Sequence, residues 1–294
     1  MQRRNFLRTT GAGLATLLTR PAWASPANSP YLKTLGLQLY TLRNQLTEDV
    51  PGTIKAVADA GYYQVEPMQV VGGEPIFECA REHGLKVTSA MMDWKTLVSP
   101  GEQDVPSFQK TLDVAVAQKL KFLVIPYVGK GHRETADQLK MLAHRANRAG
   151  EACRKAGIQL CYHHHSFEFA KLPSGETGWE VFVQEFDPAL VKFEIDVFWA
   201  AIGGLDPVET IRQLKGRVAQ LHLKDLLKGT PIIYDESKVP KEAFQEIGNG
   251  IVDWPAVLNA GEFAGVTQCH VEQDQSPDPI ASIRESIRHL KSLD

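Results

Sequence analysis

Four short apolar runs in the second half of this sequence end in side chains that can ligate a metal ion. They lead to His163, Asp196, His222 and Glu272, and Glu168 follows the first of them within a few residues. Imidazole nitrogens and carboxylate oxygens are donors that divalent cations such as Mn²⁺ and Zn²⁺ take from proteins. A cation held by these residues could polarise a carbonyl oxygen of a bound molecule as a Lewis acid.

The evidence for a metal ligand differs from one of these residues to the next. Asp196 lies between mostly apolar neighbours, so its charge needs a partner or a cation, although a helix N-cap would also explain it. His222 could instead be a hydrogen-bonded core histidine, and Glu272 a surface carboxylate. Their common position at the ends of successive apolar runs favours one shared site over three separate explanations.

The stretch from residue 160 to residue 169 leaves the fourth ligand open. Alternation along a strand puts His163 and His165 on one face and His164 on the other. His163 is the natural ligand at the strand end, whereas Glu168 lies where the chain turns and could fold back onto the metal. We expect His163 or Glu168 as the ligand from this strand, and Glu272, Glu168 or His165 as acid–base groups.

The elements that would position these residues alternate regularly, because each short apolar run is followed by a longer amphipathic stretch. The predicted strands are 35–40, 63–68, 86–91, 122–126, 158–163, 191–195, 218–223 and 266–271. The predicted helices are 50–60, 75–83, 105–119, 135–156, 179–186, 205–214, 254–260 and 280–293.

This series of strand–helix units predicts parallel strands joined by right-handed crossovers. A single (β/α)₈ TIM barrel over residues 30–294, an α/β fold, fits better than an open sheet, and no GxGxxG motif follows the first strand. In such a barrel the C-terminal strand ends meet at one mouth, where the ligands would converge. The long connections 167–178 and 224–249 are expected to form a wall or lid there.

Four further residues are predicted to bind substrate at this mouth. Glu66 ends the second strand and could bind hydroxyl groups, although a structural salt bridge explains it equally well. Trp199 could stack on the apolar face of a sugar ring, with core packing as the alternative. Lys224 could contact substrate or pair with Asp225, and Arg43 follows the first strand.

The overall composition restricts the function further. A chain of 294 residues with 43% hydrophobic residues can bury a large core. Its formal net charge of −3 gives no reason to expect nucleic acid as a partner. The four cysteines show no CxxC spacing, which argues against a thiolate zinc site and against a disulfide framework.

The N-terminus has the pattern of an export signal. Arg3 and Arg4 precede a short, weakly apolar stretch and then Ala22-Trp23-Ala24, a small-x-small cleavage pattern. Residues 1–27 are therefore predicted to be a twin-arginine signal that is removed, and the mature protein is expected in the periplasm. The apolar stretch is too short to span a bilayer, so no membrane anchor is expected.

Five motifs in this order resemble the xylose isomerase-like TIM barrels, a family of sugar phosphate isomerases and epimerases related to endonuclease IV. The motifs are Leu37–Arg43, Tyr162–Phe169, Ile195–Trp199, Leu221–Asp225 and Val271–Asp274. The resemblance implies one divalent cation, often Mn²⁺, held by Glu, Asp, His and Glu from strands five to eight. Asp196, His222 and Glu272 match the last three of these ligands.

The sequence departs from that family at His163, where most of its sugar epimerases carry glutamate. The usual proton exchange between two glutamates is therefore not implied for this chain. The pattern Tyr-His-x-His-x-x-Glu-Phe is similar to a subgroup found beside sugar oxidoreductases, and some of those proteins act on 3-keto-glycosides.

The expected reaction is proton abstraction next to a carbonyl, giving an enediolate that the cation stabilises. We expect a metal-dependent isomerase or epimerase acting on a small sugar or keto-sugar, with Mn²⁺ favoured and Zn²⁺, Mg²⁺ or Co²⁺ as alternatives. Loss of a β-substituent from the same intermediate would make the protein a lyase or dehydratase for keto-sugars or 3-keto-glycosides. A periplasmic sugar-binding protein without catalysis is a third, less favoured hypothesis. The number of subunits stays open.

Overall fold

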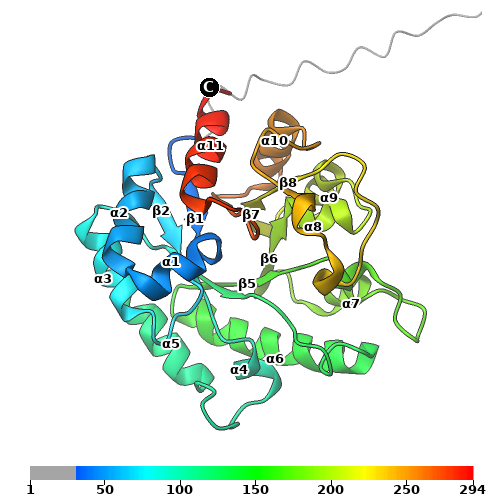
Figure 1. The fold of residues 1–294 in the computed structure, drawn as a ribbon. Coiled ribbons are helices and arrows are strands. Elements are labelled where there is room, and N and C mark those ends of the chain that lie inside the picture. Colours follow the sequence, from blue (N-terminus) through cyan, green and yellow to red (C-terminus); the bar gives the residue numbers. More distant parts are fainter. Residues whose placement is uncertain (1–30, 294) are drawn as a thin grey trace, which may run out of the picture.

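The predicted strands form a nearly closed barrel at the centre of the molecule, with helices around it (Figure 1). The computed structural model describes residues 31–293, so the predicted export signal, residues 1–27, lies outside the described residues. The barrel strands are β1 (Gly36–Gln38), β2 (Gln64–Glu66), β3 (Ser89–Met91), β4 (Phe122–Ile125), β5 (Gln159–His163), β6 (Val191–Asp196), β7 (Val218–Leu223) and β10 (Gln268–Val271). The prediction of a single (β/α)₈ TIM barrel is confirmed.

The paired barrel strands run parallel and almost close on themselves. Their order is β2-β1-β10-β7-β6-β5-β4-β3. A parallel bridge between Gln64 and Lys86 brings β2 beside the chain that enters β3, and the amide of Val65 donates to the carbonyl of Lys86 at 2.9 Å. The C-terminal ends of the strands therefore surround one mouth.

Helices cover the outside of this barrel, and capping side chains mark where several of them begin. They are α1 (Arg43–Glu48), α2 (Val50–Ala60), α3 (Glu74–Glu82), α4 (Lys95–Val98), α5 (Phe108–Ala117), α6 (Ala136–Lys155), α7 (Gly178–Glu185), α8 (Val197–Ile202), α9 (Pro207–Gln213), α10 (Trp254–Ala264) and α11 (Pro279–Lys291). Thr135 and Gln138 form a capping box at the start of α6, and Asp49 caps α2. Gly61 ends α2 with a φ of 93°, which residues with a Cβ rarely adopt.

Three segments at the mouth differ from the sequence prediction. Strand β1 stops at Gln38, whose side chain caps a 3₁₀ turn over Leu39–Leu42. After β6 the chain enters the short helix α8 directly, with no loop between them. The connection after β7 contains an antiparallel pair, β8 (Asp225–Leu226) with β9 (Phe244–Gln245). Elements this short carry too little periodicity to be recognised in a sequence.

Successive residues of a strand face two different environments. On β6, Phe193 and Ile195 belong to the hydrophobic layer between sheet and helices, whereas Glu194 and Asp196 point into the barrel. The barrel interior is therefore polar near the mouth, and the main hydrophobic core lies outside it. Within residues 31–293, none of the helices has the length and apolar character needed to cross a membrane.

Candidate metal centre in the barrel mouth

Four of the predicted ligands meet at the ends of β5, β6, β7 and β10. They are His163, Asp196, His222 and Glu272, here termed the mouth group, and one donor atom from each lies within 4.8 Å of the others. His163 Nε2 is 3.5 Å from Asp196 Oδ2, and His222 Nδ1 is 3.0 Å from Glu272 Oε2. Two imidazoles and two carboxylates in this arrangement form a donor set for a divalent cation.

A hydrogen bond orients His163 toward the centre of the mouth group. Its Nδ1 lies 3.2 Å from the carbonyl oxygen of Pro126, which follows β4. A carbonyl only accepts, so Nδ1 carries the proton and Nε2 keeps a free lone pair. Among the residues described, Nε2 is buried without a hydrogen-bond partner. A backbone carbonyl behind the imidazole is a usual support for a metal-binding histidine.

Asp196 combines the two roles that the sequence left as alternatives. Its Oδ1 accepts a hydrogen bond from the amide of Trp199 at 3.0 Å and so caps α8. Its Oδ2 lies near His163 Nε2 and Lys224 Nζ but makes no hydrogen bond within residues 31–293. One oxygen therefore fixes the carboxylate while the other is left for a cation.

His222 has a carboxylate on either side of its ring. Its Nδ1 faces Glu272, and its Nε2 is 2.8 Å from Glu66 Oε2 and 3.3 Å from Glu194 Oε1. Burial alone would lower the pKa of His222, but the charges of Glu194 and Glu272 outweigh burial and raise this pKa well above its usual value. A cation at Nδ1 would replace the proton there and leave Nε2–H as a donor to Glu66.

Lys224 places a positive charge beside the mouth group. Its Nζ lies 3.2 Å from Asp196 Oδ2, 3.0 Å from Glu272 Oε2 and 2.8 Å from Asp274 Oδ1. Burial alone would lower the pKa of Lys224, but these carboxylates raise it. Burial in turn works to raise the pKa of Asp196 and of Glu272, and the nearby Lys224 overcomes it and lowers both. Both carboxylates are therefore ionised, which is the form that ligates metal.

Glu168 does not join the mouth group. Its Oε1 accepts a hydrogen bond from the hydroxyl of Tyr162 at 2.6 Å, and its Oε2 accepts one from the amide of His165 at 2.9 Å. Burial raises the pKa of Glu168 to about 8, although these hydrogen bonds act in the opposite direction. Glu168 therefore closes the turn after β5, and the structure brings only His163 of this pair to the other ligands.

The two remaining histidines of this stretch have different surroundings. The ring centroid of His165 is 4.9 Å from that of His163 and 4.9 Å from that of Trp199, at the edge of the mouth group. Burial lowers the pKa of His165 well below its usual value, so the ring is neutral. His164 Nε2 accepts a hydrogen bond from the amide of Asp196 at 3.2 Å and so holds the backbone of a mouth residue.

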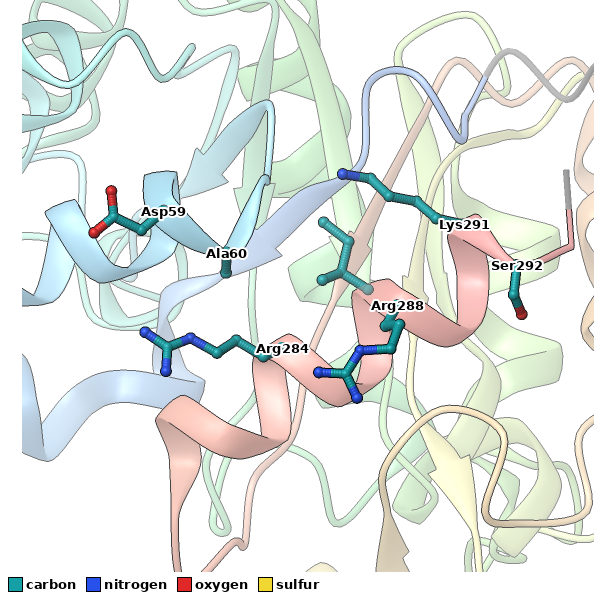
Figure 2. Close-up of a pocket in the computed structure, with 7 residues that line it drawn as sticks. Asp59, Ala60, Arg284, Arg288, Lys291 and Ser292 are labelled. Carbon is teal, nitrogen blue, oxygen red and sulfur yellow. The ribbon is translucent and has the colours of Figure 1, made fainter.

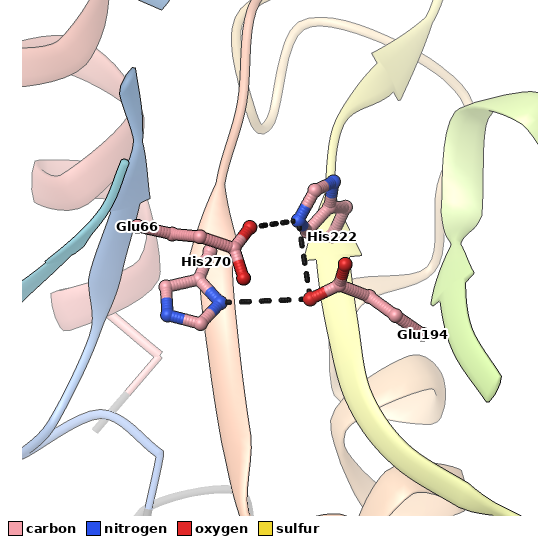
Figure 3. Close-up of side chains that lie close together, drawn as sticks. All are labelled: Glu66, Glu194, His222 and His270. Atoms are coloured by element: carbon pink, nitrogen blue, oxygen red, sulfur yellow. Dashed lines mark hydrogen bonds and ion pairs between the residues drawn. The ribbon is translucent and has the colours of Figure 1, made fainter. Parts of the chain in front are cut away.

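A second polar cluster lies deeper in the barrel, and Figure 3 shows its side chains converging from four strands. It consists of Glu66, Glu194, His222 and His270, here termed the inner group, whose donor atoms also lie within 4.8 Å of one another. All four side chains are fully buried. Glu66 was predicted to bind substrate at the mouth, but it sits below His222 and does not reach the solvent.

Sequence reasoning missed Glu194 and His270, although the signal was present. Glu194 stands two residues before Asp196, and His270 stands two residues before Glu272. Residues two apart on a strand share a face, so these side chains had to point into the barrel as well.

Trp199 and Arg43 lie at the rim of the mouth. The ring of Trp199 is nearly buried, and its centroid is 5.3 Å from Lys224 Nζ. Arg43 donates to the carbonyls of Tyr40 and Asp274, at 2.9 Å each. Arg43 therefore holds the loop after β10.

The long connection after β7 reaches across to the loop after β4. Arg133 donates a hydrogen bond to Glu236 Oε1, which also accepts one from the hydroxyl of Tyr127 at 2.7 Å. Lys130 Nζ lies 3.2 Å from Asp235 Oδ1. These contacts tie the middle of the connection 224–249 to the loop after β4.

Two hollows differ in their relation to the mouth group. One of about 360 Å³ lies beside the ends of β2, β3 and β4 and is lined in part by Met68, Trp94 and Pro126. Because Pro126 contacts His163, this hollow adjoins the mouth group. The other, of about 470 Å³, lies where α2 and α11 end and is lined by Arg284 and other basic side chains (Figure 2). It contains none of the predicted site residues.

The fold corresponds to a known family. The family model for xylose isomerase-like TIM barrels matches residues 54–293. An inosose dehydratase from Clostridium tetani is 25% identical over 215 residues, which cover 65% of this chain and 70% of that protein. An inosose dehydratase from Lacticaseibacillus casei is 25% identical over 239 residues, covering 71% and 76%.

Solved structures share the same architecture. A sugar phosphate isomerase/epimerase from Parabacteroides distasonis superposes with a TM-score of 0.71 at 24% identity and covers 95% of this chain and 98% of its own. The 3-keto-D-glucoside 4-epimerase YcjR from E. coli has a TM-score of 0.64 at 14% identity, covering 88% and 99%. The IOLI protein, solved with a bound zinc atom, has a TM-score of 0.60 at 15% identity, covering 88% and 96%.

These likenesses to solved structures define a TIM barrel, and the model match defines the family. The chain belongs to the xylose isomerase-like TIM barrel family. Its inosose dehydratase relatives and the epimerases among its structural neighbours are enzymes.

Proposed function

We propose that this protein is a divalent-metal-dependent enzyme that removes a proton next to the carbonyl group of a sugar-like substrate. The observation that carries the proposal is the convergence of His163, Asp196, His222 and Glu272 within 4.8 Å at the barrel mouth. The donors fit a cation, because His163 Nε2 and Asp196 Oδ2 are buried and lack hydrogen-bond partners among the described residues. The cation, when bound, would polarise the substrate carbonyl as a Lewis acid.

Glu272 is the base in this proposal. It is the most exposed carboxylate of the mouth group, with 6% of its surface accessible, and Lys224 keeps it ionised. It would accept the proton from the carbon next to the carbonyl and leave an enediolate. His165 and Trp199 line the same side of the mouth and would hold the sugar-like ring.

The fate of the enediolate decides between two reactions, and the geometry favours loss of water. Glu168, which the sequence offered as a second base, is held by Tyr162 and by the amide of His165. The mouth thus pairs one carboxylate base with the ammonium of Lys224, 3.0 Å from Glu272 Oε2. Glu272 would take the proton from carbon and pass it to the departing hydroxyl, which Lys224 holds by a hydrogen bond and which leaves as water. An inosose, the substrate class in the relatives' name, is the first compound to test.

Isomerisation or epimerisation is the second candidate, as the sequence first suggested. It requires a group that returns the proton to carbon on the other face, and the ring of His165, 4.9 Å from that of His163, is placed for this role. The fold shared with sugar isomerases and epimerases is compatible with it.

The experiment combines metal analysis with product analysis in D₂O. Wild-type protein loaded with Mn²⁺, Zn²⁺ or Co²⁺ is incubated with an inosose, keto-sugars and 3-keto-glycosides. Dehydration gives a product lighter by one water, whereas epimerisation or isomerisation gives an unchanged formula with deuterium bound to carbon. Glu272→Gln is expected to lower kcat by about 10²-fold or more, while the exposed variant Glu82→Gln leaves it unchanged. Wild-type protein that takes up no divalent cation would contradict the proposal.

We also propose that residues 1–27 direct export through the twin-arginine route. The supporting feature is Arg3-Arg4 before a weakly apolar stretch and a small-x-small motif. Cell fractionation of the wild type and of an Arg3→Lys, Arg4→Lys double variant provides the test. Wild-type protein that stays unprocessed in the cytoplasm would refute export.

A further inference from the structure

The inner group contains buried polar atoms that the mouth chemistry does not use. Both carboxylate oxygens of Glu194 and both ring nitrogens of His270 lack a hydrogen-bond partner within residues 31–293. The two side chains are fully buried and face each other, with His270 Nδ1 4.0 Å from Glu194 Oε1 (Figure 3). A buried carboxylate and imidazole left in this state cost free energy unless something binds between them.

The ion pairs around the inner group support the same conclusion. His222 is the common ion-pair partner of Glu66, Glu194, Asp196 and Glu272. Among the residues described, Lys224 pairs only with Asp196, Glu272 and Asp274, so its charge does not serve the inner group. Among the described residues, Glu66 and Glu194 therefore have only imidazole rings as ion-pair partners, so a bound cation would balance their charge.

From these observations, we propose that the inner group binds a second divalent cation through Glu66, Glu194, His222 and His270. The donor atoms are spaced like ligands of one ion, with His222 Nε2 2.8 Å from Glu66 Oε2 and 3.3 Å from Glu194 Oε1. Two carboxylates balance the charge of the ion, and two imidazoles with two carboxylates suit Zn²⁺, Co²⁺ or Mn²⁺.

The two cation sites differ in their access to solvent. The inner ligands have no accessible surface. Protein atoms would therefore fill every coordination position of the ion, as in structural metal sites. In the mouth group, His163 and Glu272 retain some exposure, as a site that accepts substrate requires. The inner cation would therefore stabilise the barrel, and it would leave only slowly.

His222 links the two sites. Its Nδ1 faces Glu272 in the mouth group and its Nε2 faces Glu66 in the inner group. With both cations bound, His222 would supply one ring nitrogen to each site, and both ring protons would pass to solvent. Binding of the inner cation then replaces the hydrogen bond from Nε2 to Glu66 by a metal–nitrogen bond.

The backbone leaves room for this arrangement at one position on β1. A Cβ at Gly36 would overlap Cδ2 of the His270 ring and would lie 2.9 Å from Cγ of Gln64. Glycine at this position thus allows the His270 imidazole to lie inside the barrel.

Metal stoichiometry tests the inference. Purified protein is loaded with Zn²⁺, freed of excess ion and measured by elemental analysis before and after short exposure to EDTA. We expect about two ions per chain before EDTA and about one after it, because only the mouth ion exchanges quickly. Unfolding in guanidinium with EDTA should release the second ion.

Variants assign each ion to its group. Glu194→Gln and His270→Gln should remove the EDTA-resistant ion and keep the fast one, whereas His163→Gln should do the reverse. Glu82→Gln, on the exposed face of α3, is the control and should keep both. In the Co²⁺-loaded protein, visible absorption that survives EDTA would report the closed inner site even if an inner variant fails to fold.

Failure of the inner site and failure of the mouth centre would give different results. A wild type that binds one ion, lost in His163→Gln and kept in Glu194→Gln, would overturn the inner cation and assign ordered water to the inner group. That result would leave the mouth centre of the proposed function intact. One EDTA-resistant ion lost only in Glu194→Gln would instead support the inner site and refute the mouth centre.

Discussion

At the scale of single residues, the mouth group relies on side chains that do two things at once. His163 donates from Nδ1 to the carbonyl of Pro126 and keeps Nε2 free, and Asp196 caps α8 with one oxygen while the other faces the site. Because His163 and Asp196 are each fixed by a contact on the far side, they lose little side-chain entropy when a cation binds.

The two roles of Asp196 can be separated by mutation. Asp196→Asn keeps an oxygen that can accept the hydrogen bond from Trp199, but it removes the charge that a cation requires. We expect this variant to lose the mouth ion, and in the metal-free protein to lose the ion pair with Lys224 but keep the helix cap. Asp196→Ala should lose the ion and also about 1 kcal/mol of stability from the missing cap. Elemental analysis and urea unfolding measure the two effects, and equal stability of the metal-free Asn and Ala variants would contradict the capping role.

Glu168 predicts a dependence of stability on pH. Burial raises its pKa to about 8 from an ordinary value of 4.5, so between these values the folded state keeps a proton that the unfolded chain releases. This group's contribution to stability therefore falls as pH rises from about 4.5 to about 8 and is constant beyond that range. Glu168→Gln removes the titration, so its stability relative to wild type should rise with pH, by at most about 1.4 kcal/mol per pH unit.

Urea unfolding at several pH values between 5 and 8 would measure this difference. Glu82→Gln, an exposed change of the same chemistry, is the control and should follow the wild-type curve. Parallel curves for Glu168→Gln and wild type would show that Glu168 is already ionised in the folded protein.

At the scale of elements, the strands set the depth of each polar group. Glu194 and Asp196 on β6, and His270 and Glu272 at β10, are pairs two residues apart, so each strand sends one side chain to the inner group and one to the mouth group. His222 on β7 belongs to both. The two groups are consecutive layers of one barrel interior.

Gly36 on β1 is expected to be essential for this layering. A Cβ there would overlap the His270 ring, so Gly36→Ala should displace the imidazole at a cost of about 1–3 kcal/mol of stability. If the His270 ring is the cause, the double variant Gly36→Ala, His270→Ala should lose less than the sum of the single losses. Urea unfolding of the four proteins measures this coupling, and strictly additive losses would mean that the strain lies elsewhere.

At the scale of the whole molecule, metal and fold stabilise each other. The donors come from four neighbouring strands that are far apart in the sequence, so the mouth group exists only in the folded chain. A ligand that binds only the folded state raises the stability of the protein. The gain is about 2.7 kcal/mol when the free ligand concentration is 100 times Kd.

Chelation should therefore lower the melting temperature. We expect EDTA to reduce the Tm of metal-loaded wild type by roughly 5–10 °C. In Asp196→Asn, which lacks the mouth ion, the shift should be clearly smaller. Differential scanning calorimetry at fixed protein concentration measures both, and an unchanged Tm in wild type would argue against a cation linked to folding.

The barrel and the approximate positions of its strands could be predicted from the sequence alone. Alternating apolar runs and amphipathic stretches repeat at a spacing that only parallel strands with crossover helices satisfy, so the architecture followed from local patterns. Asp196, His222 and Glu272 could be nominated because each follows such a run directly. The short elements at the mouth, such as α8 and the β8–β9 pair, were not predictable because their conformations depend on contacts with other parts of the barrel.

The folded structure was needed to choose between His163 and Glu168 and to place Glu66 below the mouth. His163 and Glu168 are both within reach of the strand end in sequence, but the hydroxyl of Tyr162 and the amide of His165 hold the Glu168 carboxylate away from the ligands. Glu66 ends its strand, yet the stagger of tilted strands in a closed barrel sets it level with Glu194 and His270. Depth inside a barrel depends on strand register, and a single sequence does not encode register locally.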